Sequence, residues 1–154
     1  MCLAQIDYIW RTKEADMKKI LVVDDTKAIL KMAKFVLNDK YDVYLSNSGE
    51  LALEILNRKP IDIVLMDVDM PDMDGVETVE KIRQMENIKD IPVMFFTALA
   101  SKETVQRCMD VGMVGYIVKP YKPEELLERL EKFFETTTYV APENGNGASE
   151  DQDE

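Results

Sequence analysis

Polar side chains follow four apolar runs of this sequence, each at the point where a run of strand length stops. Asp24 and Asp25 follow 20–23, Asp67 follows 61–66, Thr97 follows 93–96 and Lys119 follows 114–118. Neighbouring carboxylates repel one another and are costly to desolvate, so they need a partner. Carboxylate oxygens are good ligands for Mg²⁺, and a lysine and a hydroxyl can bind an anion beside the metal. These residue types therefore favour phosphoryl transfer, in which the protein supplies positioning and electrostatics.

The sequence contains no histidine. Its absence removes the commonest general base, the usual zinc ligand and the usual member of a catalytic triad. Chemistry in this chain must therefore rest on carboxylates, hydroxyls and lysine. A carboxylate nucleophile needs no general base, so the lack of histidine does not exclude chemistry in which a carboxylate attacks.

Each of these residues also has a purely structural interpretation. Asp25 or Thr26 could cap the helix that follows the first strand. Asp67 could open the turn-rich segment that comes after it. Lys119–Pro120 could mark the end of a strand, because proline cannot continue the ladder. Their joint placement favours a common site, since the carboxyl ends of parallel strands lie along one edge of a sheet.

The elements that must position these residues alternate between two periods. Strand-length apolar runs lie at 20–23, 43–45, 61–66, 93–96 and 114–118. Stretches with helical spacing of apolar residues follow them, within 29–37, 51–56, 76–85, 101–111 and 123–135. This alternation predicts an α/β fold of the flavodoxin-like (βα)5 type, a doubly wound five-stranded parallel sheet with strand order 2-1-3-4-5. Its ligand crevice is expected at the carboxyl ends of strands 1 and 3.

The chain is long enough for one domain with a full core, because 46% of its 154 residues are hydrophobic. We expect 1–16 to be an N-terminal extension that is peripheral or not native, and 17–136 to be the domain. We expect 137–154 to be a disordered acidic tail, because its Thr, Pro, Asn, Gly and acidic residues bury little apolar surface.

The net charge of −11 argues against nucleic acid or an anionic membrane as the main partner, because both require a basic face. A cation or a basic protein surface fits better. The sequence has neither a run of about 20 apolar residues nor a signal-peptide pattern, so we expect a cytoplasmic protein. Cys2 and Cys108 lie far apart, and in a reducing compartment both are expected to be unpaired thiols.

Four motifs of this chain resemble those of the bacterial response-regulator family, over roughly the segment 18–135. They are Ile20-Leu21-Val22-Val23-Asp24-Asp25, the block Asp67-Val68-Asp69-Met70-Pro71-Asp72-Met73-Asp74-Gly75, Thr97-Ala98, and Gly115-Tyr116-Ile117-Val118-Lys119-Pro120. The resemblance implies a receiver domain of two-component signalling, in a chemotaxis-type or phosphorelay-type single-domain regulator. Such a protein is a signalling phosphoacceptor and not an enzyme with a separate substrate.

Carried over by position, the resemblance implies that Asp67 accepts a phosphoryl group from a phosphohistidine of a sensor histidine kinase or a histidine phosphotransfer protein. Asp24 and Asp25 would hold Mg²⁺ together with the Asp67 carboxylate and the main-chain carbonyl of Asp69. In the family, the positions of Asp69 and Leu99 tune how easily water reaches the acyl phosphate. They would therefore bear on the lifetime of the signal.

The resemblance also implies a switch. Thr97 and Lys119 would bind the phosphoryl oxygens, and Tyr116 would follow Thr97 inward, which changes a target-binding surface formed by the fourth helix, fifth strand and fifth helix. The alternative for Tyr116 is a half-buried packing ring common to both states. Gly75 would relieve backbone strain before the third helix, and a cis bond before Pro120 would aim the lysine inward. The regulator would act as a monomer or a phosphorylation-dependent dimer.

Two other classes share parts of this pattern. Aspartyl-phosphate phosphatases of the haloacid dehalogenase type also use a strand-end Asp-x-Asp, as at 67–69, with Mg²⁺. Their nucleophile, however, precedes the acidic pair, and they usually carry a cap that roughly 120 core residues cannot accommodate. A flavodoxin-like FMN protein needs a phosphate-binding loop after strand 1, where Asp24 and Asp25 would repel the cofactor.

Overall fold

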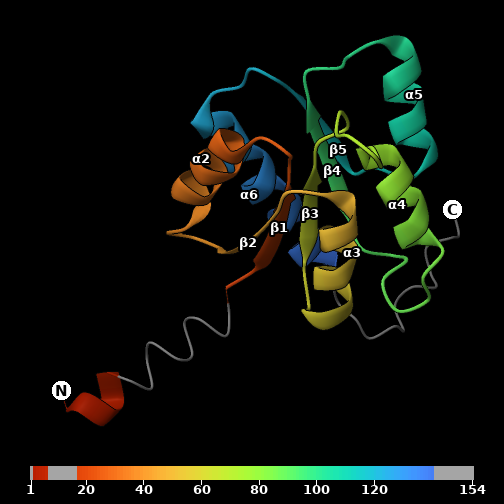
Figure 1. Cartoon of the computed structure of the whole chain (residues 1–154). Coiled ribbons are helices and arrows are strands. Elements are labelled where there is room, and N and C mark those ends of the chain that lie inside the picture. Colours follow the sequence, from red (N-terminus) through yellow and green to blue (C-terminus); the bar gives the residue numbers. More distant parts are fainter. Residues whose placement is uncertain (1, 7–16, 141–154) are drawn as a thin grey trace, which may run out of the picture. The chain divides into compact units, whose positions relative to one another are not determined.

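The computed structural model describes residues 2–6 and 17–140 of the chain. Within 17–140, five parallel strands form one sheet in the order β2-β1-β3-β4-β5, which confirms the predicted topology (Figure 1). The strands are β1 (Lys19–Val23), β2 (Asp42–Ser46), β3 (Ile63–Met66), β4 (Val93–Thr97) and β5 (Gly115–Val118). The helices that alternate with them are α2 (Lys27–Leu37), α3 (Gly49–Arg58), α4 (Gly75–Arg83), α5 (Lys102–Asp110) and α6 (Pro123–Val140).

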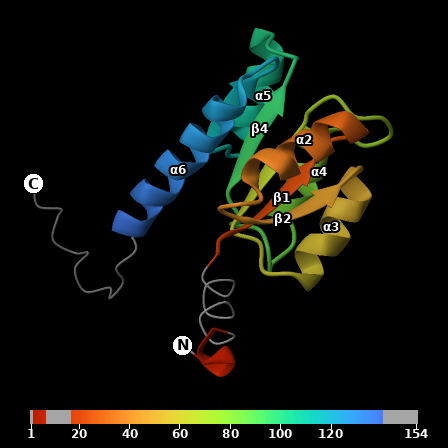
Figure 2. The same cartoon turned by 90° about the vertical axis from the view of Figure 1, so that its left-hand side faces the viewer.

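The chain divides into two compact units, one up to Tyr121 and one from Lys122 onward. The first unit contains the sheet and helices α2 to α5, and the second contains α6. In the first unit α2 covers one face of the sheet, while α3, α4 and α5 cover the other (Figure 1). Figure 2 views this sheet from the side that α2 covers. The unit is therefore doubly wound, as the sequence predicts.

The centre of the core is formed by β1 and β3, whose segments 20–23 and 63–66 are completely buried. Alternate residues of each strand point to opposite faces, so strands between two helical layers must be apolar throughout. On one face Leu21 and Val23 pack in a cluster with Ala52 and Leu56 of α3. The continuous apolar runs in the sequence thus reflect burial on both sides, and the polar residues after them mark the edge of the sheet.

Two boundaries differ from the expected ones. β3 begins at Ile63, although the apolar run begins at 61, and the Asp62 side chain accepts a hydrogen bond from the Lys19 backbone N–H at 2.7 Å. α6 continues to Val140, so the prediction that the acidic tail begins at 137 is wrong for 137–140. That stretch contains no glycine or proline to stop a helix.

The remaining parts of the predicted extension and tail, at 1, 7–16 and 141–154, lie outside the described residues. α6 has 18 residues, but no helix in the described part of the chain is long and apolar enough to cross a membrane.

Candidate functional site

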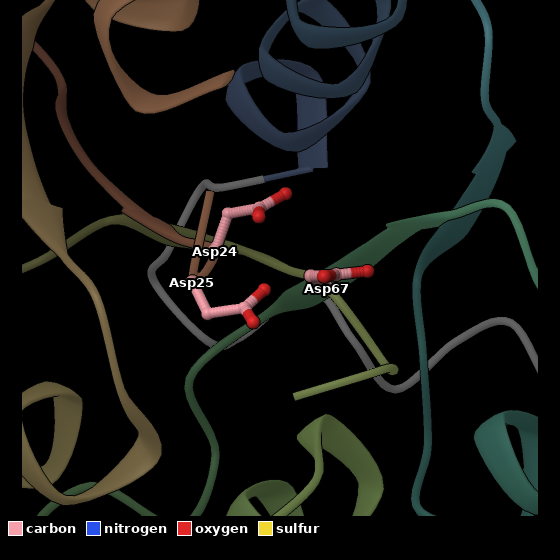
Figure 3. Close-up of side chains that lie close together, drawn as sticks. All are labelled: Asp24, Asp25 and Asp67. Carbon is pink, nitrogen blue, oxygen red and sulfur yellow. The ribbon is translucent and has the colours of Figure 1, made fainter. Parts of the chain in front are cut away.

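The carboxyl ends of β1 and β3 bring three acidic side chains together (Figure 3). Asp24 and Asp67 follow residues that are paired in the sheet, so they leave the two strands side by side. The Asp67 backbone N–H continues this pairing by donating to Val23 O at 3.0 Å. One carboxylate oxygen from each of Asp24, Asp25 and Asp67 lies within 4.8 Å of the other two. The sequence prediction that these acids converge is confirmed.

The three carboxylates differ in their exposure to solvent. Asp24 is completely buried, Asp67 is 4% exposed, and Asp25 is exposed. Buried carboxylates this close raise one another's free energy unless positive charge compensates them. Hard oxygen ligands at this spacing, two of them shielded and one open to solvent, fit a divalent ion such as Mg²⁺, which keeps several of its waters.

Lys119 reaches this acidic group from the end of β5. Its Nζ lies 2.6 Å from Asp24 Oδ2 and 3.6 Å from Asp67 Oδ1. The Lys119 backbone N–H donates to Thr97 O at 2.9 Å, which extends the β4–β5 pairing to this residue. The Lys119–Pro120 peptide bond is cis, as the resemblance implies. Lys119 therefore lies within the site, but its closer partner is Asp24 and not Asp67.

Asp67 has the most perturbed carboxyl group of the site. Burial, and after it the charge of Asp24, raise the pKa of Asp67 to about 6. Lys119, the Thr97 side chain and the backbone N–H of Asp69 act in the opposite direction by favouring the ionised form. At neutral pH the Asp67 carboxyl is therefore still mostly ionised. Asp69 contributes here through its backbone, and its exposed carboxylate is not a member of the acidic group.

Gly75 lies directly against the main chain of Asp67. A Cβ at position 75 would overlap the Asp67 carbonyl oxygen and would lie 2.9 Å from the carbonyl carbon. Among the described residues, positive φ angles occur at Asp72 (69°) and Gly112 (82°), and not at Gly75. The prediction that Gly75 relieves backbone strain is therefore wrong. Glycine is required at this position because two stretches of backbone approach closely.

The predicted switch residues lie on one connected path. Thr97 is buried, and its side chain favours the ionised form of Asp67, which opposes the rise in the pKa of that carboxyl. The Thr97 Oγ1 also accepts the Leu99 N–H at 3.1 Å, and the Tyr116 hydroxyl donates to the Leu99 carbonyl. Leu99, predicted to tune signal lifetime, is 41% exposed. This path connects the acidic group to a half-buried tyrosine on β5.

Of the two residues that could cap the helix after the first strand, Thr26 occupies the N-cap position of α2, but its side chain makes no cap hydrogen bond. The Thr26 backbone N–H donates to Asp24 Oδ1 at 2.8 Å. Asp24 therefore holds the start of α2 with one oxygen and Lys119 with the other. The exposed carboxylate of Asp25 remains a member of the acidic group with Asp24 and Asp67.

An ion pair beside the site was not predicted from the sequence. Arg107 Nη2 of α5 lies 3.0 Å from Asp74 Oδ2, at the N-cap of α4. Asp74 and Glu77 form a capping box, in which each side chain accepts the other residue's backbone N–H at 2.8 Å. The Asp-x-x-Glu spacing at 74–77 could have revealed the cap, whereas the pairing with α5 depends on the tertiary structure.

Tyr121 is a second residue that sequence reasoning missed. Its ring centroid lies 6.2 Å from that of Phe96, and the Lys119 ammonium lies 4.9 Å from the same Phe96 ring. The Tyr121 hydroxyl is buried and, among the described residues, has no hydrogen-bond partner. Burial, and after it the charge of Asp24, raise the pKa of Tyr121 to about 12, so the hydroxyl keeps its proton. No sequence signal separates this tyrosine from an ordinary packing ring.

Comparison with known proteins assigns the family. The family model described as the response regulator receiver domain matches residues 20–131. The chemotaxis protein CheY-3 of Vibrio cholerae is 36% identical over 119 residues, which cover 76% of this chain and 92% of that protein.

Solved structures agree with this assignment. The Vibrio cholerae chemotaxis protein CheY4 matches with a TM-score of 0.72 at 36% identity, over 75% of this chain and 98% of that chain. The receiver domain of the sensor histidine kinase PA1611 of Pseudomonas aeruginosa, solved with a magnesium ion coordinated in its active-site cleft, matches with a TM-score of 0.70 at 30% identity, over 77% and 98% of the two chains. This chain belongs to the response regulator receiver domain family.

Proposed function

We propose that this protein is a phosphorylation-activated response regulator in which Asp67 accepts a phosphoryl group from the phosphohistidine of a sensor histidine kinase or a histidine phosphotransfer protein. The observation that carries this proposal is the convergence of three carboxylates and Lys119 at one edge of the sheet. Receiver domains are signalling phosphoacceptors, and membership of that family supports the assignment.

Receiver domains bind Mg²⁺ at an acidic cluster, and this chain has the residues for it. The carboxylates of Asp24, Asp25 and Asp67 would hold the ion, together with the main-chain carbonyl of Asp69. When bound, the ion supplies positive charge that offsets the repulsion among the acids and neutralises charge on the transferred group. The magnesium ion in the related PA1611 receiver supports this choice of metal.

Asp67 would act as the nucleophile. One of its carboxylate oxygens forms a bond to phosphorus as the P–N bond of the donor breaks, and the departing imidazole keeps the electron pair and takes a proton. With a pKa of about 6, the Asp67 carboxyl is mostly in the ionised, nucleophilic form at neutral pH. The ammonium of Lys119 and the hydroxyl of Thr97 would bind the phosphoryl oxygens and stabilise their charge.

Phosphorylation would then change the surface of α5 and β5 through the path from Thr97 to Tyr116. A phosphoryl group competes for the Thr97 hydroxyl, whose oxygen also accepts the Leu99 N–H, and Leu99 in turn accepts from Tyr116. We therefore expect a movement of Thr97 to reach the tyrosine. Asp69 and Leu99 lie next to the acceptor and the threonine, where they would affect the access of water to the acyl phosphate.

The partners we propose are proteins. They are a histidine kinase or phosphotransfer protein as donor and a downstream target that recognises the altered surface. The net charge of −11 disfavours nucleic acid and anionic membranes as partners. We place the regulator in the cytoplasm, as a monomer or a phosphorylation-dependent dimer.

The phosphatase alternative gains no support from the family model or the relatives. In this chain the acidic pair at 24–25 precedes the proposed nucleophile, which is the reverse of the order in the haloacid dehalogenase class. Hydrolysis of small phosphate esters in amounts exceeding the protein itself would reinstate that alternative. A yellow purified protein would instead indicate a bound flavin.

The test is phosphorylation by acetyl phosphate in the presence of Mg²⁺. Intact-mass measurement should show one added phosphoryl group that is lost in base, as expected for an acyl phosphate. Asp67→Asn should abolish the addition, whereas Asp39→Asn, at an exposed residue after α2, should leave it unchanged. Undiminished phosphorylation of the Asp67→Asn variant would place the acceptor elsewhere.

A further inference from the structure

A buried hydroxyl without a partner lies beside the proposed phosphorylation site. Native proteins rarely leave such groups unsatisfied, so each one requires an explanation. The Tyr121 hydroxyl is buried, and among the described residues no group accepts or donates a hydrogen bond to it. Its ring packs near Phe96, the ring that the Lys119 ammonium faces at 4.9 Å. Besides burial, the charge of Asp24 raises the pKa of this hydroxyl, so the hydroxyl belongs to the surroundings of Lys119 and Asp24.

Both oxygens of Asp24 already have donors in this structure. Oδ1 accepts the Thr26 backbone N–H at 2.8 Å, and Oδ2 accepts from Lys119 Nζ at 2.6 Å. The same Nζ lies 3.6 Å from Asp67 Oδ1, so only a short movement would take it to an anion carried by Asp67. Asp24 offers one ligand oxygen to the proposed metal. With the metal on Oδ1, the movement of the lysine would leave Oδ2 without its donor while the carboxylate remains fully buried. A buried carboxylate oxygen deprived of its donor is strongly destabilising.

We propose that Tyr121 is a positioning residue whose hydroxyl replaces Lys119 as the hydrogen-bond donor to Asp24 when the lysine turns to an anion bound at Asp67. The inference rests on the proposed function, because the anion is the phosphoryl group or a mimic of it. No proton changes hands in the exchange, since the phenol keeps its proton and only its acceptor is new. Before the anion binds, the unpartnered hydroxyl is therefore available as a hydrogen-bond donor.

Tyr121→Phe should affect the ligand-free protein and the anion-bound protein differently. At rest it removes a hydroxyl that has no partner, so the melting temperature of the ligand-free protein should stay the same or rise. With the site occupied it removes the donor to Asp24, so the apparent affinity for beryllofluoride in saturating Mg²⁺ should fall about tenfold, the usual effect of one hydrogen bond to a charged group. Loss of packing alone would instead lower stability in both states.

The experiment titrates the full chain with beryllofluoride in Mg²⁺ and follows thermal unfolding. The matched control is Tyr44→Phe, on the outer strand β2, whose hydroxyl donates to Asp42 Oδ2 at 3.3 Å far along the sheet from Lys119. Equal beryllofluoride affinities for wild type and Tyr121→Phe would overturn the inference and leave the proposed function intact. A wild-type protein that gains no stability from beryllofluoride would overturn both.

A second measurement observes the hydroxyl environment directly. In a protein with labelled tyrosine rings, the Tyr121 resonance is the one of six that disappears in Tyr121→Phe. It should shift when beryllofluoride binds. It should shift in the same direction in ligand-free Lys119→Met, because loss of the ammonium frees Asp24 Oδ2 without any anion. A Tyr121 resonance that stays unchanged in both cases would contradict the exchange.

Discussion

The two ends of the parallel sheet use polar residues in opposite ways. At the amino end, the following polar groups have specific hydrogen-bond partners. Asp62 Oδ2 accepts the Lys19 N–H at 2.7 Å, and Asn87 Nδ2 donates to Asn57 Oδ1 at 2.9 Å. At the carboxyl end, three carboxylates lie together, and the ammonium of Lys119 lies beside two of them, Asp24 and Asp67. Matched polar groups stabilise a fold, whereas surplus charge held in place by the fold is available for binding.

Arg83 shows how fully the amino end is matched. Its guanidinium, at the end of α4, donates to the carbonyl oxygens of Lys89 at 2.9 Å, Ile91 at 2.7 Å, Val111 at 2.9 Å and Gly112 at 3.2 Å. These carbonyls belong to the loops that lead into β4 and β5. One side chain therefore fixes the entry to two strands.

The largest effect on stability is expected from breaking that arrangement. Arg83→Met should lower the free energy of unfolding by about 3 kcal/mol, because four carbonyls lose a charged donor. Chemical denaturation measures the loss, and phosphorylation by acetyl phosphate should be unchanged. Lys81→Met, an exposed change on the same helix, is the control. A loss no greater than that of the control would mean that the loops keep their conformation without the hydrogen bonds from Arg83.

The opposite sign is expected at the carboxyl end. Asp67→Asn should raise the free energy of unfolding without Mg²⁺ by about 2 kcal/mol at pH 7.5, because it removes a carboxylate that is desolvated and repelled by Asp24. The folded pKa of about 6 lies above the usual 3.8, so folded Asp67 binds its proton more tightly than the unfolded chain does. Wild-type stability from this group is therefore complete below pH 3.8 and is lost as the pH rises through 6.

Thermal unfolding between pH 4 and pH 7.5 measures this difference. The advantage of Asp67→Asn over wild type should be small at the acid end and grow toward neutral pH. Asp39→Asn, at an exposed residue, is the control for the change of charge alone. An advantage that is independent of pH would show that repulsion at Asp67 is not its cause.

Asp25 offers a way to separate metal binding from folding. Because it is exposed, Asp25→Asn should change the free energy of unfolding by less than about 0.5 kcal/mol. It should nevertheless weaken Mg²⁺ binding about tenfold, since it removes one charged ligand. Isothermal titration calorimetry with Mg²⁺ measures the affinity. An unaltered affinity would remove Asp25 from the proposed metal ligands.

The smallest effect is expected from the ion pair between α5 and α4. The side chains of Arg107 and Asp74 are 46% and 27% exposed, so water and salt screen their attraction. Arg107→Met should therefore cost no more than about 0.5 kcal/mol. Asp74→Ala should cost about 1 kcal/mol, because it also removes the cap of α4. Equal losses in the two variants would show that the pair, and not the cap, is the stabilising contact.

Much of the fold could be predicted because its strands are buried on both faces. Runs such as 63–66 are apolar throughout, and their spacing with amphipathic helices leaves few possible topologies. The two missed boundaries have local causes. Asp62 uses its side chain at the start of the sheet, and the helix that starts at Pro123 meets no residue that would stop it before Val140.

The sequence predicted which residues form the site, but it did not predict which of them contact one another. The ends of parallel strands must meet at one edge, so the convergence of Asp24, Asp25 and Asp67 followed from the order of the strands. That Lys119 contacts Asp24 more closely than Asp67 depends on side-chain geometry that no spacing encodes. The same holds for Tyr121, because only the tertiary structure shows that its buried hydroxyl has no hydrogen-bond partner among the described residues.

The contact between Gly75 and the carbonyl of Asp67 has a mechanical consequence. Because there is no room for even one methyl group between them, the Asp67 backbone and the first turn of α4 are in direct contact. A displacement of the Asp67 backbone should therefore displace the start of α4 as well. A chemical event at this carboxylate would then change the position of a helix that contains none of the reacting groups. Gly75→Ala would push the two stretches of backbone apart and weaken this coupling between Asp67 and α4.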